Sequence, residues 1–168
     1  MVHLGMIPEW RPVETLLDAL EYSPSLLTLD IFGYVYPEAQ NKISLNNQLR
    51  RQVRCHAPVS HEDSHHIADL SDLLLVVIGP RHLDNQPSKF FEYLGHSKPV
   101  LVLGPLGNPI QSITESLGIG LYVDILKVEQ IRQAILHVCN NYSDYVDAYR
   151  RSHSRIHLYS AEQAAKHW

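Results

Sequence analysis

The feature that most constrains the fold of this chain is the regular alternation of short apolar runs with amphipathic helical patterns. The most apolar run is LLLVVIG, from Leu73 to Gly79, which is continuously apolar instead of alternating. A strand of this kind is buried on both faces, so we expect it at the centre of a parallel sheet covered by helices. Five other apolar runs are predicted to form strands, at residues 2–6, 26–33, 53–59, 99–104 and 119–124.

Helical patterns separate these runs. They cover residues 13–20, 37–49, 87–94, 110–118 and 128–142, and Pro37 stands at a favoured first-turn position. Six strand–helix alternations with right-handed crossovers predict an α/β fold, namely a Rossmann-like, doubly wound parallel sheet of six strands. The length of 168 residues is that of one domain.

The two ends of the chain suggest a part of something larger. The sequence opens directly on a strand, and the tail from Ser143 has helical pieces that end in YSAEQAAKHW, an unfinished amphipathic pattern. We therefore expect residues 1–168 to be a single domain excised from a longer two-domain chain.

Composition excludes several classes of protein. A formal net charge of −4 argues against a nucleic-acid partner, which normally selects a basic patch. No apolar run approaches the roughly 20 residues that cross a bilayer, and the first residues resemble a strand more than a signal peptide. Cys55 and Cys139 lie in apolar segments and are expected to be free, buried thiols in a reducing compartment. These features predict a soluble, cytoplasmic chain.

Eleven histidines raise the question of a metal site. The densest group is His61, His65 and His66, in which His61 and His65 share one helical face at spacing i, i+4. This spacing can hold zinc, but a structural zinc site needs four ligands and no cysteine is near. A solvated helix face is the favoured interpretation, and no metal is expected.

The loops after the strands contain the residues that could carry chemistry, because open parallel sheets bind ligands beyond the carboxyl ends of their strands. The loop after the first strand holds Gly5 and Arg11, and the helix after the fourth strand begins with Ser88 and Lys89. Backbone N–H groups at a helix start favour a phosphate, and Arg11 and Lys89 can add charge-assisted hydrogen bonds. This combination of donors predicts a diphosphate ligand.

Two acids accompany these donors. Asp84 precedes the helix, and Glu92 lies on its second turn, on the same face as Ser88. The other face, with Phe90, Phe91 and Leu94, is expected to pack on the sheet. A carboxylate accepts hydrogen bonds from adjacent hydroxyls, so these positions suit ribose or sugar recognition. By spacing alone, a solvated acid is the alternative.

The segment PSKFFEYLGHSKPVLVLGP resembles the most recognisable stretch of glycosyltransferase family 4, in which a loop acid, a Pro-Ser-Lys helix start, a Glu and a Pro-Val strand recur. HLGMIPEWRPVETLLDAL is similar to the family's first strand, glycine loop and helix. VRCHAPVSHEDSHHIADLSDLLLVV is similar to its third and fourth strands, LGIGLYVD to its sixth, and YSAEQAAKHW to the start of its last helix.

The resemblance implies the C-terminal, nucleotide-sugar-binding half of a GT-B enzyme. Such an enzyme transfers a sugar from a UDP- or GDP-sugar to a glycan or lipid-linked acceptor with retention of configuration, in cell-envelope or extracellular polysaccharide synthesis. It needs no metal or cofactor. Its partners would be the donor and the missing N-terminal acceptor-binding domain, and the full-length enzyme can associate peripherally with a membrane. The isolated domain is expected to be inactive.

The resemblance also assigns roles. Asp84 and Glu92 would contact the donor sugar and the ribose hydroxyls, and Arg11 would bind the diphosphate with Lys89 beside it. These four residues would be catalytic, since Arg11, Lys89 and helix dipoles would stabilise the charge of the leaving group. Gly5 would let the backbone approach the phosphates. The remaining donor-site residues would be His56, Pro58 and Val59, which line the base, together with His82, Pro87 and Ser88.

The chain departs from the family pattern at four positions. Asp84 stands where Glu is frequent, and Met6 stands where a second basic residue is common. Ala57 replaces a glycine after the third strand, and Ser97 replaces the glycine that commonly ends the motif helix.

Two other functions remain open at this point. A sugar-nucleotide epimerase shares the architecture but would need further acids and histidines in the cleft, for which His82 is the one obvious candidate. A non-enzymatic flavodoxin-like or receiver-like module is the other. A receiver needs an acid cluster after the first strand, where this chain has GMIPEWRP.

Overall fold

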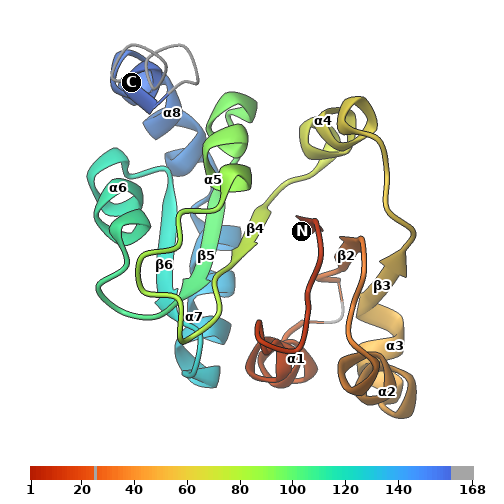
Figure 1. The fold of residues 1–168 in the computed structure, drawn as a ribbon. Helices are drawn as coiled ribbons and strands as arrows, with labels where there is room; N and C mark the ends of the chain where they lie inside the picture. The colour runs from red at the N-terminus through yellow and green to blue at the C-terminus, as the bar shows by residue number, and fades with distance from the viewer. Residues whose placement is uncertain (25, 160–168) are drawn as a thin grey trace.

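The computed structural model describes residues 1–24 and 26–159, and it contains a six-stranded, all-parallel sheet (Figure 1). The strand order is β3-β2-β1-β4-β5-β6. The strands are β1 (Val2–Leu4), β2 (Leu29–Phe32), β3 (Val53–His56), β4 (Leu74–Val77), β5 (Val100–Gly104) and β6 (Gly120–Asp124). All six predicted strands are confirmed, and β4, the most apolar, lies inside the sheet as expected.

Helices cover both faces of the sheet (Figure 1). One face packs against α1 (Glu14–Glu21), α2 (Pro37–Leu45), α3 (Asn47–Gln52) and α7 (Val128–Asn140). The other packs against α4 (His61–Leu70), α5 (Ser88–Tyr93), α6 (Pro109–Leu117) and α8 (Tyr142–Ile156). Short 3₁₀ turns follow α5 at Leu94–His96 and α8 at His157–Tyr159. Because side chains alternate along a strand, Leu75 and Val77 of β4 enter one core and Leu74 and Val76 the other.

The structure divides one predicted helix. The pattern at 37–49 predicted a single helix, but Asn46 has an extended backbone and separates α2 from α3. Its side-chain oxygen accepts hydrogen bonds from the N–H groups of Gln48 and Leu49, and so caps α3. Local capping by Asn competes with helix continuation, which is why the periodicity alone missed the break.

The cysteine prediction was wrong about burial. Cys55 and Cys139 are both free and both exposed. Cys55 lies on β3, the outer strand of the sheet, and Cys139 follows the buried Val138 on α7 and so lies off the helix face that enters the core. Apolar neighbours in sequence do not place a side chain on the buried face of its own element.

No helix among residues 1–24 and 26–159 is long and apolar enough to cross a membrane. Of the tail segment that resembles the start of the family's last helix, residues 159–168, all but Tyr159 lie outside the described residues.

Candidate functional site

The sheet reverses its winding between β1 and β4. From β1 the chain moves outward to β2 and β3, and from β4 it moves the other way to β5 and β6. The loops after β1 and β4 therefore leave in opposite directions and open a crevice between them, where open parallel sheets bind ligands. This crevice at the carboxyl ends of β1 and β4 is the candidate site.

Side chains replace part of the hydrogen-bond ladder between β1 and β4. Only one pair of residues in β1 and β4, Val2 and Leu74, is aligned as in a regular parallel ladder. Beyond it, the N–H of Leu4 donates to the Tyr93 hydroxyl at 3.1 Å. The carbonyl of Leu75 accepts a hydrogen bond from His3 Nδ1 at 3.0 Å. The strands can thus separate toward the site while their buried backbone groups remain paired.

His3 lies at the bottom of this opening. A carbonyl oxygen cannot donate, so Nδ1 of His3 carries a proton and its Nε2 is an acceptor in the neutral ring. Nε2 is buried and has no hydrogen-bond partner among the described residues. The pKa of His3 is lowered to about 4, mainly because burial disfavours the charged ring; the positive charges of Arg11 and Lys89 contribute to the shift, and the hydrogen bond to the Leu75 carbonyl opposes it.

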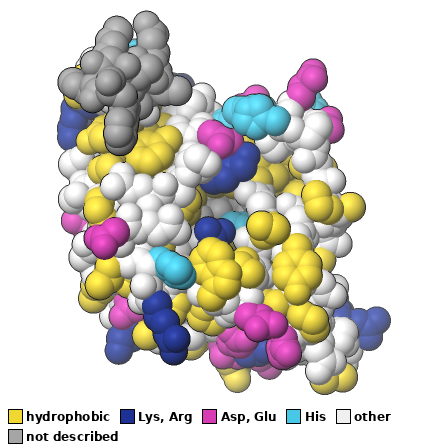
Figure 2. All heavy atoms as spheres, in the orientation of Figure 1, with side chains coloured by type: hydrophobic (Ala, Val, Ile, Leu, Met, Phe, Trp, Pro, Cys, Tyr) yellow, Lys and Arg dark blue, Asp and Glu magenta, His cyan; other side chains and the backbone are white. Residues whose placement is uncertain are grey.

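Figure 2 shows Lys or Arg and His side chains in a hollow near the centre of the face in view. The loop after β1 contributes Arg11 and the start of α5 contributes Lys89, so positive charge comes from both sides of the switch point.

Arg11 is half-buried in the loop after β1. One terminal nitrogen donates to the carbonyl of Met6 at 3.2 Å, and the guanidinium carbon lies 4.5 Å from the centre of the Trp10 ring. Burial lowers the pKa of Arg11, and its Nε has no hydrogen-bond partner among the described residues. The side chain is held by its own loop and retains donors for an anion.

Lys89 and Glu92 form an ion pair on α5. Lys89 Nζ lies 2.6 Å from Glu92 Oε2, and both side chains are about 30% exposed (30% and 27%). Burial alone would raise the pKa of Glu92, but the hydrogen bond and charge of Lys89, with the charge of His61, hold it below its ordinary value. Glu92 is an ionised acceptor whose second oxygen is free for hydroxyl groups.

Asp84 lies on the exposed loop between β4 and α5 and makes no hydrogen bond or ion pair with the described residues. The loop itself is fixed by Asn108, which is 2% exposed. Its amide nitrogen donates to the carbonyls of His82, Leu83 and Asn85, and its amide oxygen caps α6 at the N–H of Ile110. Asn108 therefore positions the segment that carries Asp84.

The helix start is shorter than the sequence suggests. Pro87 precedes α5, which spans only Ser88–Tyr93, and no side chain caps it. Because the helix dipole grows from aligned peptide units, six residues contribute less to anion binding than a full helix. Phe90 and Leu94 pack in the core as predicted, whereas Phe91 is only partly buried.

Gly5 has the backbone freedom that the resemblance requires. Its φ is +136°, and a Cβ there would find its nearest neighbour, His3 Nε2, at 4.0 Å. The neighbouring Gly33 is needed for a different reason, because its Cβ would lie 2.4 Å from the Gly5 carbonyl oxygen. Gly33 thus lets the ends of β1 and β2 approach each other closely, whereas Gly5 adopts a backbone conformation that other residues disfavour.

His56 lies farther along the same edge, at the end of β3. It is two strands from β1, or about 10 Å. Its Nε2 lies 2.8 Å from Asp30 Oδ1, and its ring stacks on Phe32 at 4.3 Å between centroids. Pro58 and Val59 follow in the exposed connection to α4. A cavity of about 510 Å³ opens beside His56, lined by the ends of β2 and β3 and by α2.

The histidines of the loop before α5 and of helix α4 divide into two groups by exposure. His82 is exposed, and its ring lies 4.7 Å from that of Trp10. His61 and His66 are also exposed, in agreement with a solvated helix face. His65 differs, because it is half-buried and its Nδ1 lies 3.0 Å from His96 Nε2.

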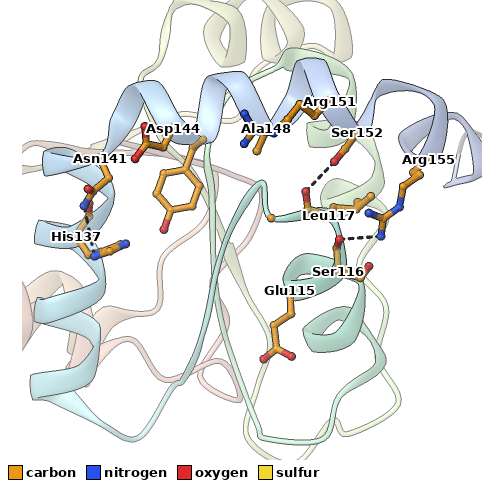
Figure 3. A pocket seen from close by; sticks show the side chains of 12 residues that line it. Glu115, Ser116, Leu117, His137, Asn141, Asp144, Ala148, Arg151, Ser152 and Arg155 are labelled. Carbon is orange, nitrogen blue, oxygen red and sulfur yellow. Dashed lines mark hydrogen bonds between the residues drawn. The ribbon is translucent and has the colours of Figure 1, made fainter.

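A second cavity, of about 540 Å³, lies between the ends of α6, α7 and α8 (Figure 3). Two bonds cross it: the Ser152 hydroxyl donates to the Leu117 carbonyl at 2.9 Å and Arg155 to the Ser116 carbonyl at 2.7 Å. The α6 residues that line this cavity directly precede β6, so it lies at the amino end of that strand. It is therefore separate from the candidate site.

The structure pairs Lys89 with Glu92, places Arg11 on the other side of the switch point, and leaves Asp84 exposed on the loop before α5. His3, Tyr93 and Asn108 were not predicted to act there. A histidine inside the apolar strand VHL and an Asn-Pro helix start were the available signals. Which strand and loop these groups would contact was not visible in the sequence.

No family model and no curated protein sequence matches this chain. Solved structures do. WaaG, a glycosyltransferase involved in lipopolysaccharide biosynthesis, has a TM-score of 0.73 at 17% identity, over 98% of this chain and 45% of WaaG. The chain therefore has the fold of one half of a GT-B glycosyltransferase.

Two further structures agree. Anabaena HepE in complex with UDP gives a TM-score of 0.73 at 15% identity, over 92% of this chain and 43% of HepE. The C-terminal domain of the Francisella tularensis glycosyltransferase LpcC gives 0.70 at 14% identity, over 91% of this chain and 83% of that domain. The chain spans less than half the length of WaaG and HepE. The fold that the family resemblance implied is confirmed.

Proposed function

We propose that this chain is the donor-binding half of a retaining glycosyltransferase and that it binds a UDP- or GDP-sugar in the crevice between β1 and β4. The observation that carries the proposal is the placement of Arg11, in the loop after β1, and of Lys89, at the start of α5, on the two sides of the switch point where the sheet opens. The HepE structures, of the same fold, are complexes with UDP and with UDP-glucose, which supports the choice of ligand.

In this proposal the diphosphate lies between Arg11 and Lys89. These cations stabilise the negative charge that develops on the leaving nucleotide, as preorganised electrostatics does in other transferases. Glu92 accepts the ribose hydroxyls with the oxygen that Lys89 does not hold. Asp84 contacts the donor sugar, and the end of β3 with His56, Pro58 and Val59 lines the base. The transfer requires no metal.

The acceptor site belongs to an N-terminal domain outside this chain, so the isolated domain binds donor without turnover. The acceptor is a glycan or a lipid-linked sugar in surface polysaccharide synthesis, on the cytoplasmic side and with peripheral membrane contact of the full-length enzyme. The involvement of WaaG, a protein of the same fold, in lipopolysaccharide biosynthesis supports this class of acceptor.

Isothermal titration of the chain with UDP, GDP and uridine tests the proposal. We expect a diphosphate to bind more tightly than the nucleoside. Arg11→Ala and Lys89→Ala should each weaken binding by about 10- to 150-fold, since a charge-assisted hydrogen bond contributes roughly 1.5–3 kcal/mol. Arg132→Ala on α7, whose partner is Glu129, is the matched control and should leave the affinity unchanged. Diphosphate binding that survives both substitutions would refute the site.

A further inference from the structure

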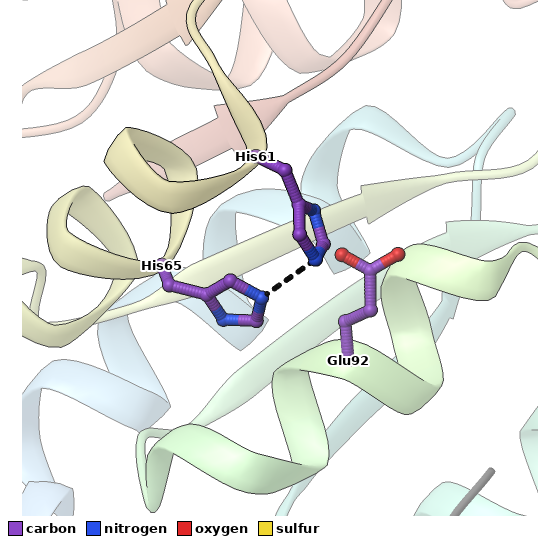
Figure 4. A group of neighbouring side chains, drawn as sticks. All are labelled: His61, His65 and Glu92. Carbon is purple, nitrogen blue, oxygen red and sulfur yellow. Dashed lines mark hydrogen bonds between the residues drawn. The ribbon is translucent and has the colours of Figure 1, made fainter.

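The side chains of His61, His65 and Glu92 meet between α4 and α5 (Figure 4). Each offers one ligand atom, and these atoms lie within 4.8 Å of one another. We propose that His61, His65 and Glu92 bind a zinc ion. The sequence indicated only the two histidines, because the third ligand comes from a different helix that the fold brings alongside.

The spacing of the two histidines suits zinc. Their Nε2 atoms lie 3.1 Å apart. Zinc–nitrogen bonds of 2.0–2.1 Å in a tetrahedral site place two ligand atoms about 3.3 Å apart, so the rings need almost no movement. Glu92 projects toward His61 in Figure 4, and its ligand oxygen lies within 4.8 Å of both histidine nitrogens, so zinc binding would draw the carboxylate toward them.

A relay of hydrogen bonds prepares His65 for a metal. Asp69 Oδ1 lies 2.7 Å from His96 Nδ1, and His96 Nε2 lies 3.0 Å from His65 Nδ1. The carboxylate accepts, so His96 carries its proton on Nδ1 and must accept at Nε2. His65 then carries its proton on Nδ1, which leaves a lone pair on Nε2 facing His61. A carboxylate that orients a ligand histidine is the usual support of zinc sites.

Glu92 is supported as well. Lys89 donates to Oε2 at 2.6 Å and leaves the other oxygen for an ion. Ligand carboxylates in metal sites are themselves hydrogen-bonded, which fixes their orientation. Two histidines and one glutamate form a three-ligand set, which leaves a fourth position of a tetrahedral zinc open to water or to a ligand oxygen.

This proposed site departs from the expectation that the chain binds no metal. It also predicts an effect on the binding of the nucleotide-sugar donor. Zinc would engage the Glu92 carboxylate, which is the acceptor assigned to the ribose hydroxyls. Zinc and nucleotide should therefore compete. This consequence, unlike the metal site itself, depends on the proposed function.

Titration of the metal-free chain with Zn²⁺ alone, by calorimetry, tests the site. We expect about one ion per chain. Glu92→Gln and His65→Ala should each weaken binding at least tenfold, because even changes behind a ligand cost about 10- to 100-fold. Asp69→Asn should weaken it less, and circular dichroism verifies that each variant is folded.

Two controls separate this site from general affinity of histidines for zinc. His66→Ala removes an exposed neighbour on the same helix, and His153→Ala removes one member of another i, i+4 pair, with His157 on the turn after α8. Neither should change the affinity. The proposal is overturned if wild type takes up no zinc, or if Glu92→Gln and His65→Ala bind as wild type does.

A second titration, of UDP into the zinc-loaded chain, tests the competition. Weaker UDP binding than in the metal-free chain is expected, and the difference should vanish in His65→Ala. If the metal-free chain binds no UDP, the proposed function fails while the zinc titration still stands. If UDP binds equally with and without zinc, Glu92 does not serve both the zinc ion and the ribose hydroxyls.

Discussion

The two edges of β4 differ, although both face a parallel neighbour. Toward β5, four residue pairs stay in register, from Leu74 opposite Val100 to Val77 opposite Leu103. Toward β1 there is one such pair, and the next backbone groups bond to the side chains of His3 and Tyr93. A sheet can open at its centre when buried polar side chains replace the missing ladder, and here it opens where a ligand is expected.

The glycines show the same contrast. A Cβ on Gly120, in β6, would lie 1.8 Å from the Val100 carbonyl oxygen of β5. A Cβ on Gly5, at the end of β1, would have its nearest neighbour at 4.0 Å. The β5–β6 side excludes additional atoms, whereas the end of β1 has room for a methyl group beside the His3 ring. Substitutions on either side of β4 test this difference.

Gly120→Ala should have the largest effect. The methyl group would overlap backbone that cannot move without separating β5 from β6, so we expect the free energy of unfolding to fall by about 4 kcal/mol or more. Urea denaturation measures it. Gly95→Ala, where a Cβ would meet nothing within 4 Å, is the control and should change stability little. A small loss in Gly120→Ala would show that the closed edge is looser than described.

His3 makes the open edge sensitive to pH. Its folded-state pKa of about 4 lies below the ordinary value of 6.5, so the unfolded chain binds more protons between these values. Its contribution is therefore complete above pH 6.5 and is lost as the pH falls toward 4. Between pH 7 and 4.5 this linkage removes about 2–3 kcal/mol of stability.

The variant His3→Asn tests this. Its free energy of unfolding, measured by urea denaturation at the two pH values, should fall by about 2–3 kcal/mol less than that of the wild type. His66→Asn, an exposed control, should keep the wild-type dependence, and equal slopes in all three proteins would contradict the assignment.

Tyr93→Phe removes the acceptor of the Leu4 N–H. The buried donor would be left unpaired, which costs about 1–3 kcal/mol. Urea denaturation should show this loss, and hydrogen exchange at the Leu4 amide should accelerate. Tyr22→Phe is the control, because Tyr22 is 73% exposed. Unchanged exchange at Leu4 would mean that the hydroxyl does not substitute for the ladder.

Ser97→Gly should have the smallest effect, and a favourable one. Ser97 ends the turn that leads into β5 and has a φ of +52°, the one non-glycine residue with positive φ among those described. Glycine adopts this conformation without the steric penalty, so we expect a gain of about 0.5–1 kcal/mol in thermal or urea unfolding. The comparison variant Ser112→Gly, inside α6, should instead lower the free energy of unfolding by a similar amount. A loss in Ser97→Gly would refute the strain argument.

Much of the fold could be predicted from local pattern. The continuous run at Leu73–Gly79 identified a central strand, and the alternation of strands and helices identified a parallel, doubly wound sheet. The prediction of a single helix at 37–49 failed because the hydrogen bonds of the Asn46 side chain cap a second helix and so outweigh the helical periodicity. The prediction that Cys55 and Cys139 are buried failed for a related reason, since the exposure of a side chain depends on which face of its helix or strand is covered.

The candidate site was predicted only in part. Arg11, Lys89 and Glu92 could be named because loops after parallel strands share one edge of the sheet, but their partners could not. The roles of Tyr93 against Leu4 and of Asn108 beneath the Asp84 loop depend on contacts between elements far apart in sequence.

The order and type of the elements follow from the sequence alone, because strand and helix periodicities are set by residues close together along the chain. So does the choice of loops that carry charge. Only the folded arrangement separates β1 from β4 after one pair, buries His3 beside that opening, and brings Glu92 next to two histidines of another helix. Each of these depends on the register and packing of distant segments, which a local pattern does not specify.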